Sequence, residues 1–235
     1  MYASFKQLIY PHKCMICREI LEKNSIGHLC DKCYSFVLRN NLCARCGRPY
    51  NIGDQYCVYC NKDEETVIEQ IVPLFLYDEK FKKAVLRWKY SGLRKYAKGY
   101  ADLFANDLCI IDKLNIEGLI PVPLAPRRAR KRGFNQALDL TNEISKLTGA
   151  PVYDVLKRVK ETKAQSQCNK KERLVNIKGS IVMKTDISAL DIKNIAIVDD
   201  IYTTGATIKE CIGALNRQNS IAGKKIYVLT VCIGI

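Results

Sequence analysis

The sequence lacks any apolar run long enough to cross a bilayer, which takes about 20 residues. Residues 1–6 also lack the basic and then apolar form of a secretory signal peptide. Low-complexity tracts are absent, and the only internal repeat is a cysteine pattern. These absences exclude a membrane-spanning or fibrous protein and predict a cytoplasmic one.

Histidine is scarce, with only His12 and His28 in 235 residues. Neither lies near the motifs that are expected to bind a ligand, and no cysteine near those motifs has the surroundings of an activated thiol. We therefore assign no nucleophile. Both histidines are expected to be bystanders rather than metal ligands, because the cysteines already complete two sets of four.

Acidic residues are also few, with 24 Asp and Glu against 38 Lys and Arg, for a formal net charge of +14. The chain stays basic even if eight cysteines bind zinc as thiolates. Such an excess implies anionic partners, which include nucleic acid, acidic lipid and polyphosphate substrates. Basic residues gather in the helix predicted over residues 79–90, where a solvated face and a nucleic-acid surface are the alternatives.

Cysteine, in contrast, is abundant, and eight of the twelve form four Cys-x-x-Cys pairs. A two-residue gap lets the chain turn so that both sulfurs face one ion, and tetrahedral zinc takes two such turns. Sequential use of the pairs predicts two zinc ribbons in tandem, and interleaved use is the alternative. The sequential ligand sets are Cys14, Cys17, Cys30 and Cys33, then Cys43, Cys46, Cys57 and Cys60.

The spacing of motifs predicts two domains, over residues 1–62 and 68–235, separated by a polar linker at 61–65. The first has little core, so it needs metal to fold. In the second, strands alternate with helices, which indicates an α/β fold with a doubly wound parallel sheet. Strands are expected over 71–77, 119–122, 179–183, 195–198 and 225–233, and helices over 79–90, 96–111, 135–147 and 208–216.

The stretch 195–207 is the most informative of the second domain. An apolar run typical of a buried parallel strand is followed by Asp199 and Asp200, and then by a loop of small residues at the start of a helix. Such a loop cradles phosphate with backbone N–H groups. Two carboxylates would repel a phosphate but can accept hydrogen bonds from ribose hydroxyls. The loop residues are Thr203, Thr204, Gly205, Ala206 and Thr207.

These residues fill every position of the signature of type I phosphoribosyltransferases, which the chain resembles. The resemblance implies a substrate of phosphoribosyl pyrophosphate with Mg²⁺. A structural strand–turn–helix is the alternative, but capping a helix needs one such residue rather than seven in order.

Residues 127–132 carry five cations and run into Gly133, Phe134 and Asn135. A nucleic-acid arm would account for the charges alone, whereas a pyrophosphate-binding loop also accounts for the helix start that follows. We expect Arg132, Gly133 and Asn135 to meet the pyrophosphate. Residues 156–176 are predicted to form a mobile polar lid, with Arg173 as an additional cation over the site.

The whole pattern is similar to the ComF competence family, through the paired cysteines, Pro121-Val122-Pro123, the 132–136 segment, residues 89–92 and the 195–207 motif. Family members combine a double zinc ribbon with a type I phosphoribosyltransferase fold and are linked to DNA uptake in natural transformation. One departure is Cys168-Asn169 near the middle of the lid, where an apolar residue is more usual.

Two functions follow from the resemblance. The first is an enzyme that transfers a phosphoribosyl group, with catalytic roles for Asp199, Asp200, Arg132 and Arg173. The second is a non-catalytic module that binds single-stranded DNA or the helicase of the uptake machinery. Complete motifs favour the first, and the charge excess and the ribbons favour the second. The acceptor of the transfer is not defined by these motifs.

Overall fold

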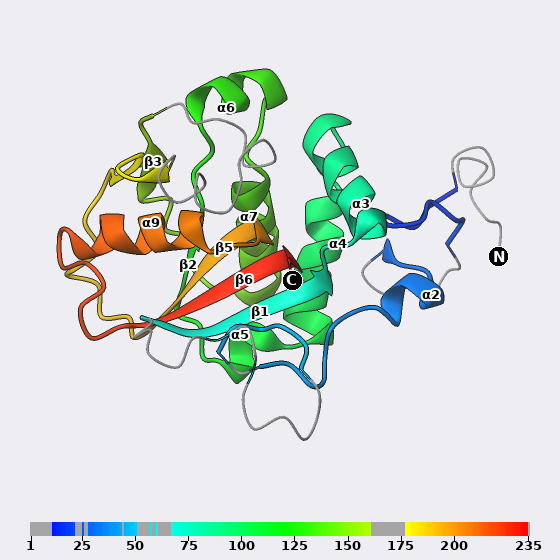
Figure 1. Cartoon of the computed structure of the whole chain (residues 1–235), viewed down its shortest axis with the longest axis horizontal. Helices are drawn as coiled ribbons and strands as arrows, with labels where there is room; N and C mark the ends of the chain where they lie inside the picture. The colour runs from blue at the N-terminus through cyan, green and yellow to red at the C-terminus, as the bar shows by residue number, and fades with distance from the viewer. Residues whose placement is uncertain are drawn as a thin grey trace.

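The computed structural model describes residues 11–21, 25, 28–43, 45–50, 57, 60, 67–160 and 177–234. Within this part of the chain, a sheet of four parallel strands lies at the centre of the molecule (Figure 1). Its order is β1 (Ile68–Leu76), β6 (Lys225–Ile233), β5 (Asn194–Tyr202) and β2 (Gly118–Pro121). The predicted α/β architecture with a parallel sheet is confirmed.

Residues of β5 alternate between the two faces of the sheet. Ile195 and Ile197 join one hydrophobic cluster and Ala196 and Val198 the other, and all four are fully buried. A strand of consecutive apolar residues therefore lies where both faces are covered, as expected for a parallel sheet.

Helices cover both faces of this sheet (Figure 1). The helix α9 (Ala206–Asn216) packs on the Ile195 face, and α3 (Glu79–Tyr90), α4 (Tyr96–Asp102) and α7 (Gln136–Thr148) pack on the other. The molecule is therefore a three-layer structure with its core on either side of β5 and β6.

Side-chain caps explain why α3 and α7 begin where the sequence predicted. The carboxylate of Asp78 accepts a hydrogen bond from the Phe81 N–H at 2.9 Å, and the Asn135 side chain accepts one from the Ala137 N–H at 3.1 Å. At the far end of α7, Gly149 takes a left-handed conformation, with φ +76°.

One continuous helix over residues 96–111 was the prediction, and it is wrong. After α4 the chain widens into a π-helical turn, η2 (Leu103–Asp107), and only a short α5 (Ile110–Lys113) follows. The wider turn keeps Leu103 and Phe104 fully buried. Cys109 then adopts φ +50°, which interrupts the helical run.

The predicted loop over residues 156–176 is also partly wrong, because its first residues form a strand. The strand β3 (Leu156–Arg158) pairs antiparallel with β4 (Ile181–Met183) beside the main sheet. Leu156 and Ile181 are buried in the cluster under α9, which explains this pairing. The remainder of the predicted lid, with Arg173, lies outside the described residues.

The cysteine-rich segment packs on the sheet domain at two places. Met15, Ile16 and Leu29, near the short helix α2 (Asp31–Tyr34), join the hydrophobic cluster of Trp88. Further on, the chain lies along the free edge of β1, where the Leu38 N–H donates to the Leu74 carbonyl at 2.8 Å and the Ile71 N–H to the Arg45 carbonyl at 3.2 Å. This segment covers a sheet edge that would otherwise be open.

One hydrophobic cluster contains residues of both predicted domains, so packing does not separate the two. The division at 1–62 and 68–235 therefore stays a prediction. Among the residues that the structure describes, none of the helices has the length and hydrophobicity needed to cross a membrane.

Candidate functional site

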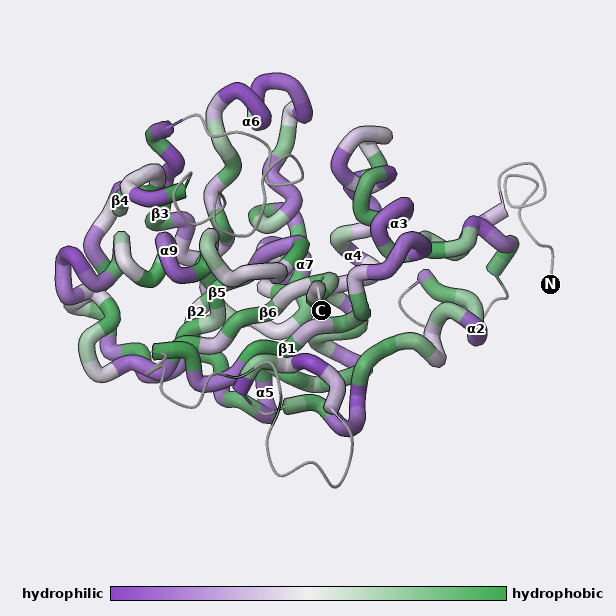
Figure 2. The backbone as a smooth tube through the Cα atoms, in the orientation of Figure 1, coloured by the Kyte–Doolittle hydropathy of each residue, from purple (hydrophilic) through white to green (hydrophobic). Residues whose placement is uncertain are grey.

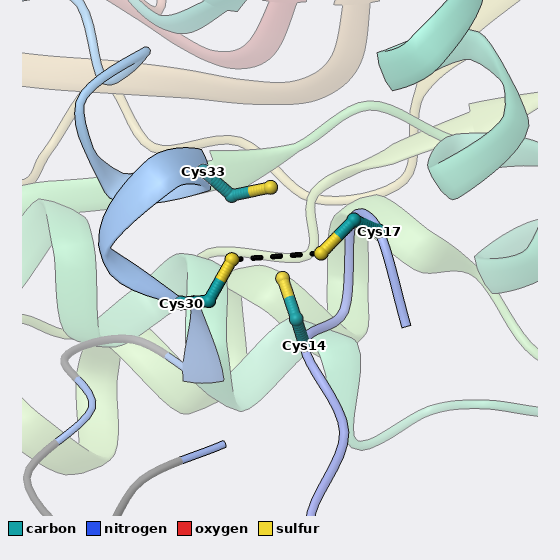
Figure 3. Close-up of side chains that lie close together, drawn as sticks. All are labelled: Cys14, Cys17, Cys30 and Cys33. Atoms are coloured by element: carbon teal, nitrogen blue, oxygen red, sulfur yellow. Dashed lines mark hydrogen bonds between the residues drawn. The ribbon is translucent and has the colours of Figure 1, made fainter. Parts of the chain in front are cut away.

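Two clusters of four cysteines are the first candidate sites, and they use the pairs in sequence order. Within each cluster all the sulfur atoms lie within 4.8 Å of one another. Figure 3 shows the first cluster, with the four thiols pointing toward a common centre. Its members are Cys14, Cys17, Cys30 and Cys33, and those of the second are Cys43, Cys46, Cys57 and Cys60. Sequential pairing is confirmed, and interleaved pairing is excluded.

Distances between the sulfurs fit tetrahedral zinc. A Zn–S bond of about 2.3 Å places the sulfurs of a tetrahedron about 3.8 Å apart. The Cys17–Cys30 and Cys46–Cys57 sulfurs are 3.5 Å apart, and those of Cys43 and Cys60 are 3.7 Å apart. The residues present therefore fit two structural zinc ions.

A tight turn shapes the second cluster. Gly47 has φ +67°, and its N–H donates to the Cys43 carbonyl at 2.9 Å. A Cβ at this position would lie 2.4 Å from the Ile71 carbonyl oxygen of β1. Glycine is thus required both by the backbone conformation and by the close approach of this turn, residues 43–48, to strand β1. We call this turn the zinc knuckle.

The two predicted carboxylates lie inside β5 rather than after it. Pairing with β6 continues to Ile201 and Tyr202, which extends the strand beyond the expected end at residue 198. The Asp200 N–H donates to the Asp199 carboxylate at 2.8 Å. Burial, and then the neighbouring charge of Asp200, raise the pKa of Asp199 to about 7.

The small-residue loop joins β5 to α9. Gly205 adopts φ +72°, and a Cβ there would lie 2.4 Å from the Tyr202 hydroxyl, so no other residue fits without a shift. The Thr204 hydroxyl accepts a hydrogen bond from the Ala206 N–H at 3.4 Å. The helix begins two residues earlier than predicted, so its first backbone N–H groups belong to the loop motif itself.

The cations of residues 127–132 form a helix, which corrects the expected loop. Pro126 begins α6 (Pro126–Arg132), and three cations lie in its last turn, where the helix dipole favours positive charge. Figure 2 shows α6 as a strongly hydrophilic segment above the sheet. Gly133 ends the helix with φ +77°.

One cavity, of about 370 Å³, opens between α6, α3 and the carboxyl end of β5. It brings together six of the predicted site residues, and the rest of its polar lining comes from α3, α6, β3, the first residue of α7 and the residue after β1. The predicted residues are Asp199, Asp200, Thr203, Thr207, Arg132 and Asn135. The additional polar residues are Tyr77, Lys82, Lys89, Tyr90, Arg128, Gln136 and Arg158.

Other predicted residues do not line this cavity. Thr204, Gly205 and Ala206 form the turn into α9 between the lining residues Thr203 and Thr207, and Gly133 ends α6. Both ends of the Asn135 amide are engaged in the fold, because its nitrogen also donates to the Val122 carbonyl at 3.0 Å.

Lys89, which the sequence indicated only as part of a basic helix face and of the 89–92 match, is a residue of the site. Its ammonium lies 2.8 Å from the Asp200 carboxylate, and their side chains are only 14% and 17% exposed. A mostly buried ion pair inside the cavity neutralises one of two adjacent carboxylates. Its signal in the sequence was the position of Lys89 at the last turn of the 79–90 helix, next to a Gly break.

Hydrogen bonds from Arg132 and Arg94 tie α3 and the segment after it to α6 and α7. The Arg132 guanidinium donates to the Tyr90 hydroxyl at 2.9 Å and to the Gln136 side chain at 3.0 Å. Arg94 makes two hydrogen bonds, of 2.7 and 2.6 Å, with the Asp139 carboxylate. The contacts with Tyr90 and Gln136 hold Arg132 in place beside the cavity.

The arrangement brings Arg128 and Arg132 of α6 into one cavity with the β5 carboxylates and the small-residue loop, at the carboxyl end of a parallel sheet. Ligands of open α/β sheets bind at this end of the strands. The molecule is thus an α/β protein with two Cys₄ clusters of the zinc-ribbon type ahead of a sheet domain that holds a polar cavity.

Comparisons with known proteins show which α/β proteins with zinc ribbons this chain resembles. A double zinc ribbon domain model matches residues 5–61. The chain is 29% identical over 225 residues to competence protein F of Haemophilus influenzae, covering 94% of this chain and 97% of that protein. It is 25% identical over 208 residues to competence protein ComFC of Bacillus subtilis, covering 86% and 83%. It is also 26% identical over 229 residues to the DNA utilization protein YhgH of Salmonella typhi, covering 94% and 98%. Over most of its length the chain is therefore similar to the ComF-type competence and DNA utilization proteins.

Proposed function

We propose that the cavity binds phosphoribosyl pyrophosphate with Mg²⁺, and that the protein is a phosphoribosyltransferase that serves DNA uptake or utilization. The observation that carries the proposal is the convergence of the β5 carboxylates, the loop at α9 and Arg132 on one cavity. The names of the relatives, competence protein and DNA utilization protein, supply the biological setting.

Each part of the ligand has a matching group. The 5′-phosphate is assigned to residues 203–207, because Thr203 and Thr207 line the cavity and the loop leads into the N-terminus of α9, where the helix dipole favours an anion. Asp199 and Asp200 accept hydrogen bonds from the ribose hydroxyls. The pyrophosphate lies toward Arg128 and Arg132 on α6.

Catalysis in this proposal is electrostatic. Breaking the bond from ribose C1 to pyrophosphate leaves positive charge on the sugar and negative charge on the leaving group. The carboxylates of Asp199 and Asp200 stabilise the first, and Arg132 stabilises the second. Mg²⁺, which prefers carboxylate, substrate and water oxygens, would offset part of the pyrophosphate charge when bound. Arg173 remains proposed as an additional cation.

Calorimetric titration with phosphoribosyl pyrophosphate and Mg²⁺ tests the proposal. The wild-type protein should bind one ligand per chain, and Asp199→Asn/Asp200→Asn should bind about 2–4 kcal/mol more weakly, because two charge-assisted hydrogen bonds are lost. Zinc content, measured on both proteins, controls for folding of the ribbons. Absence of binding by the wild-type protein would sink the proposal.

A second candidate is the binding module, and the exposed face of α6 favours it. Arg127, Arg130 and Lys131 are exposed there, so part of the charge is not used by the cavity. Transformation of cells that carry Asp199→Asn/Asp200→Asn separates the two candidates. Normal DNA uptake with this variant would favour a role in binding single-stranded DNA or a helicase.

A further inference from the structure

Arg48, in the second zinc ribbon, reaches the loop that follows β5, although 155 residues separate the two in sequence. Its guanidinium Nη2 donates to the Thr203 carbonyl at 2.8 Å, and its Nε donates to the Gly234 carbonyl, also at 2.8 Å. The same guanidinium lies 5.9 Å from the centre of the Tyr202 ring. One side chain therefore holds the ends of β5 and β6 at the base of the loop.

The segment that Arg48 contacts is already closely packed. The Gly234 N–H donates to the Tyr202 carbonyl at 2.8 Å, so the ends of β5 and β6 are joined directly. The Tyr202 hydroxyl in turn fills the space where a Cβ of Gly205 would lie. A displacement of the Thr203 carbonyl would thus be passed on to the turn at Gly205.

Arg48 is itself fixed by the zinc knuckle. Its carbonyl accepts a hydrogen bond from the Cys43 N–H at 2.9 Å, and the intervening Gly47 packs on β1. The guanidinium is the side chain suited to two carbonyl acceptors, because its donors form a rigid fork. Without the knuckle, the Arg48 backbone would have no fixed position from which to reach the loop.

We propose that Arg48 is a positioning residue, through which the second zinc ribbon holds the 203–207 loop in the conformation that binds the 5′-phosphate. The proposal rests on the proposed function and adds a role for the ribbon in it. The zinc ribbon is then part of the support of the ligand site and not only a separate folded unit.

Arg39 offers a matched control. It also belongs to the cysteine-rich region and bridges it to the sheet domain, through an ion pair with Asp107 of η2. It makes no contact with the loop among its described interactions, which are with Val37, Tyr34 and Asp107. Arg39→Ala removes the same side chain and a similar number of contacts.

The experiment compares full-length, zinc-loaded wild type, Arg48→Ala, Arg48→Lys and Arg39→Ala. Zinc per chain, affinity for phosphoribosyl pyrophosphate with Mg²⁺, and amide hydrogen exchange of residues 203–207 are measured on each. Arg48→Ala should retain two zinc ions, weaken binding about tenfold and exchange the loop amides faster, because both carbonyl contacts are lost. Arg48→Lys should give an affinity and a loop exchange rate between those of wild type and Arg48→Ala, since an ammonium can replace one of the two contacts. Arg39→Ala should match wild type in ligand affinity and in the hydrogen exchange of residues 203–207.

Unchanged affinity and loop exchange in zinc-loaded Arg48→Ala would overturn the proposal, and so would an equal loss in Arg39→Ala. If Arg48→Ala fails to hold zinc, Arg48→Lys decides in its place, and wild-type values there count against the proposal. If wild type does not bind the ligand, the proposed function fails, and the exchange of the loop amides still decides whether Arg48 holds the loop.

Discussion

At the scale of single residues, the site is defined by two carboxylates that the chain places side by side. Asp199 is held by the Asp200 N–H, and Asp200 by Lys89. Asp200 forms a direct ion pair with a cation, whereas burial, and then the charge of Asp200, raise the pKa of Asp199 to about 7. The free protein thus carries an unfavourable, partly buried charge above neutral pH, and a cationic ligand or a sugar hydroxyl would relieve it.

This arrangement predicts how stability depends on pH. Because the pKa of Asp199 in the folded protein, about 7, lies above its ordinary value of 3.8, the stabilisation from its proton is complete below pH 3.8 and lost as pH rises through 7. Asp199→Asn removes this loss. In urea unfolding without Mg²⁺, the variant should gain stability relative to wild type between pH 6 and pH 8. A difference between the two proteins that stays constant over this range would contradict the assignment.

Arg132 is expected to act through its position and not only through its charge. Arg132→Ala should weaken binding of phosphoribosyl pyrophosphate by about 1.5–3 kcal/mol, because a charge-assisted contact to the pyrophosphate is lost. The neighbouring Lys131 is exposed and does not line the cavity, so Lys131→Ala removes the same charge from the same helix. Calorimetry on both variants gives the comparison. Equal losses of binding free energy would mean that the overall positive potential of α6, and not the position of Arg132, accounts for the effect.

At the scale of elements, the sequence predicted what depends on local chemistry. The strand at 225–233 and the helix at 79–90 match the structure, because apolar runs and a capping Asp78 act locally. The π-helical turn at 103–107 and the strand at 156–158 were missed, because distant packing decides both. The same applies to α6, where five cations were interpreted as a loop although Pro126 and a favourable helix dipole permit a helix.

Two glycines on the β5–α9 unit separate the requirements of the loop from those of the helix. Gly205→Ala adds a Cβ at φ +72° and 2.4 Å from the Tyr202 hydroxyl, so it should cost about 1–2 kcal/mol and abolish phosphate binding. Gly213→Ala adds the same methyl inside α9, where the nearest atom is 3.8 Å away, and should stabilise by about 0.5–1 kcal/mol. Thermal unfolding and ribose-5-phosphate binding measure both effects. Normal ribose-5-phosphate binding by Gly205→Ala would show that the 203–207 loop does not bind the phosphate.

At the scale of the whole molecule, the cysteine spacing was enough to predict which thiols meet, because each Cys-x-x-Cys pair is a local turn. It could not predict where the clusters pack, since those contacts are made by other residues. Arg87 of α3 donates to the Ile16 carbonyl beside the first cluster at 2.5 Å, and Arg48 joins the second cluster to the loop. The candidate cavity likewise depends on Lys89, whose partner Asp200 is 111 residues away in sequence.

The first ribbon shares its core with the sheet domain, and the only tryptophan of the chain can report this. Trp88 is fully buried in the cluster that includes Met15, Ile16 and Leu29 but none of the second-cluster cysteines. Loss of the first zinc ion should open that part of the cluster to water and shift Trp88 emission to longer wavelength. Loss of the second should leave the emission near its wild-type position, because that cluster lies along β1 instead.

Cys17→Ser and Cys57→Ser test this expectation one ribbon at a time. Each variant should contain about one zinc ion per chain, since a Cys₄ site that loses a thiolate binds the metal more weakly. Fluorescence should then separate the two proteins that metal analysis finds alike, with the red shift confined to Cys17→Ser. An unshifted spectrum in Cys17→Ser with one zinc ion, or equal shifts in both variants, would show that the first ribbon does not protect the core around Trp88. The predicted outcome would make that ribbon part of the folded body, because the hydrophobic surface it covers belongs to the helix that carries Lys89.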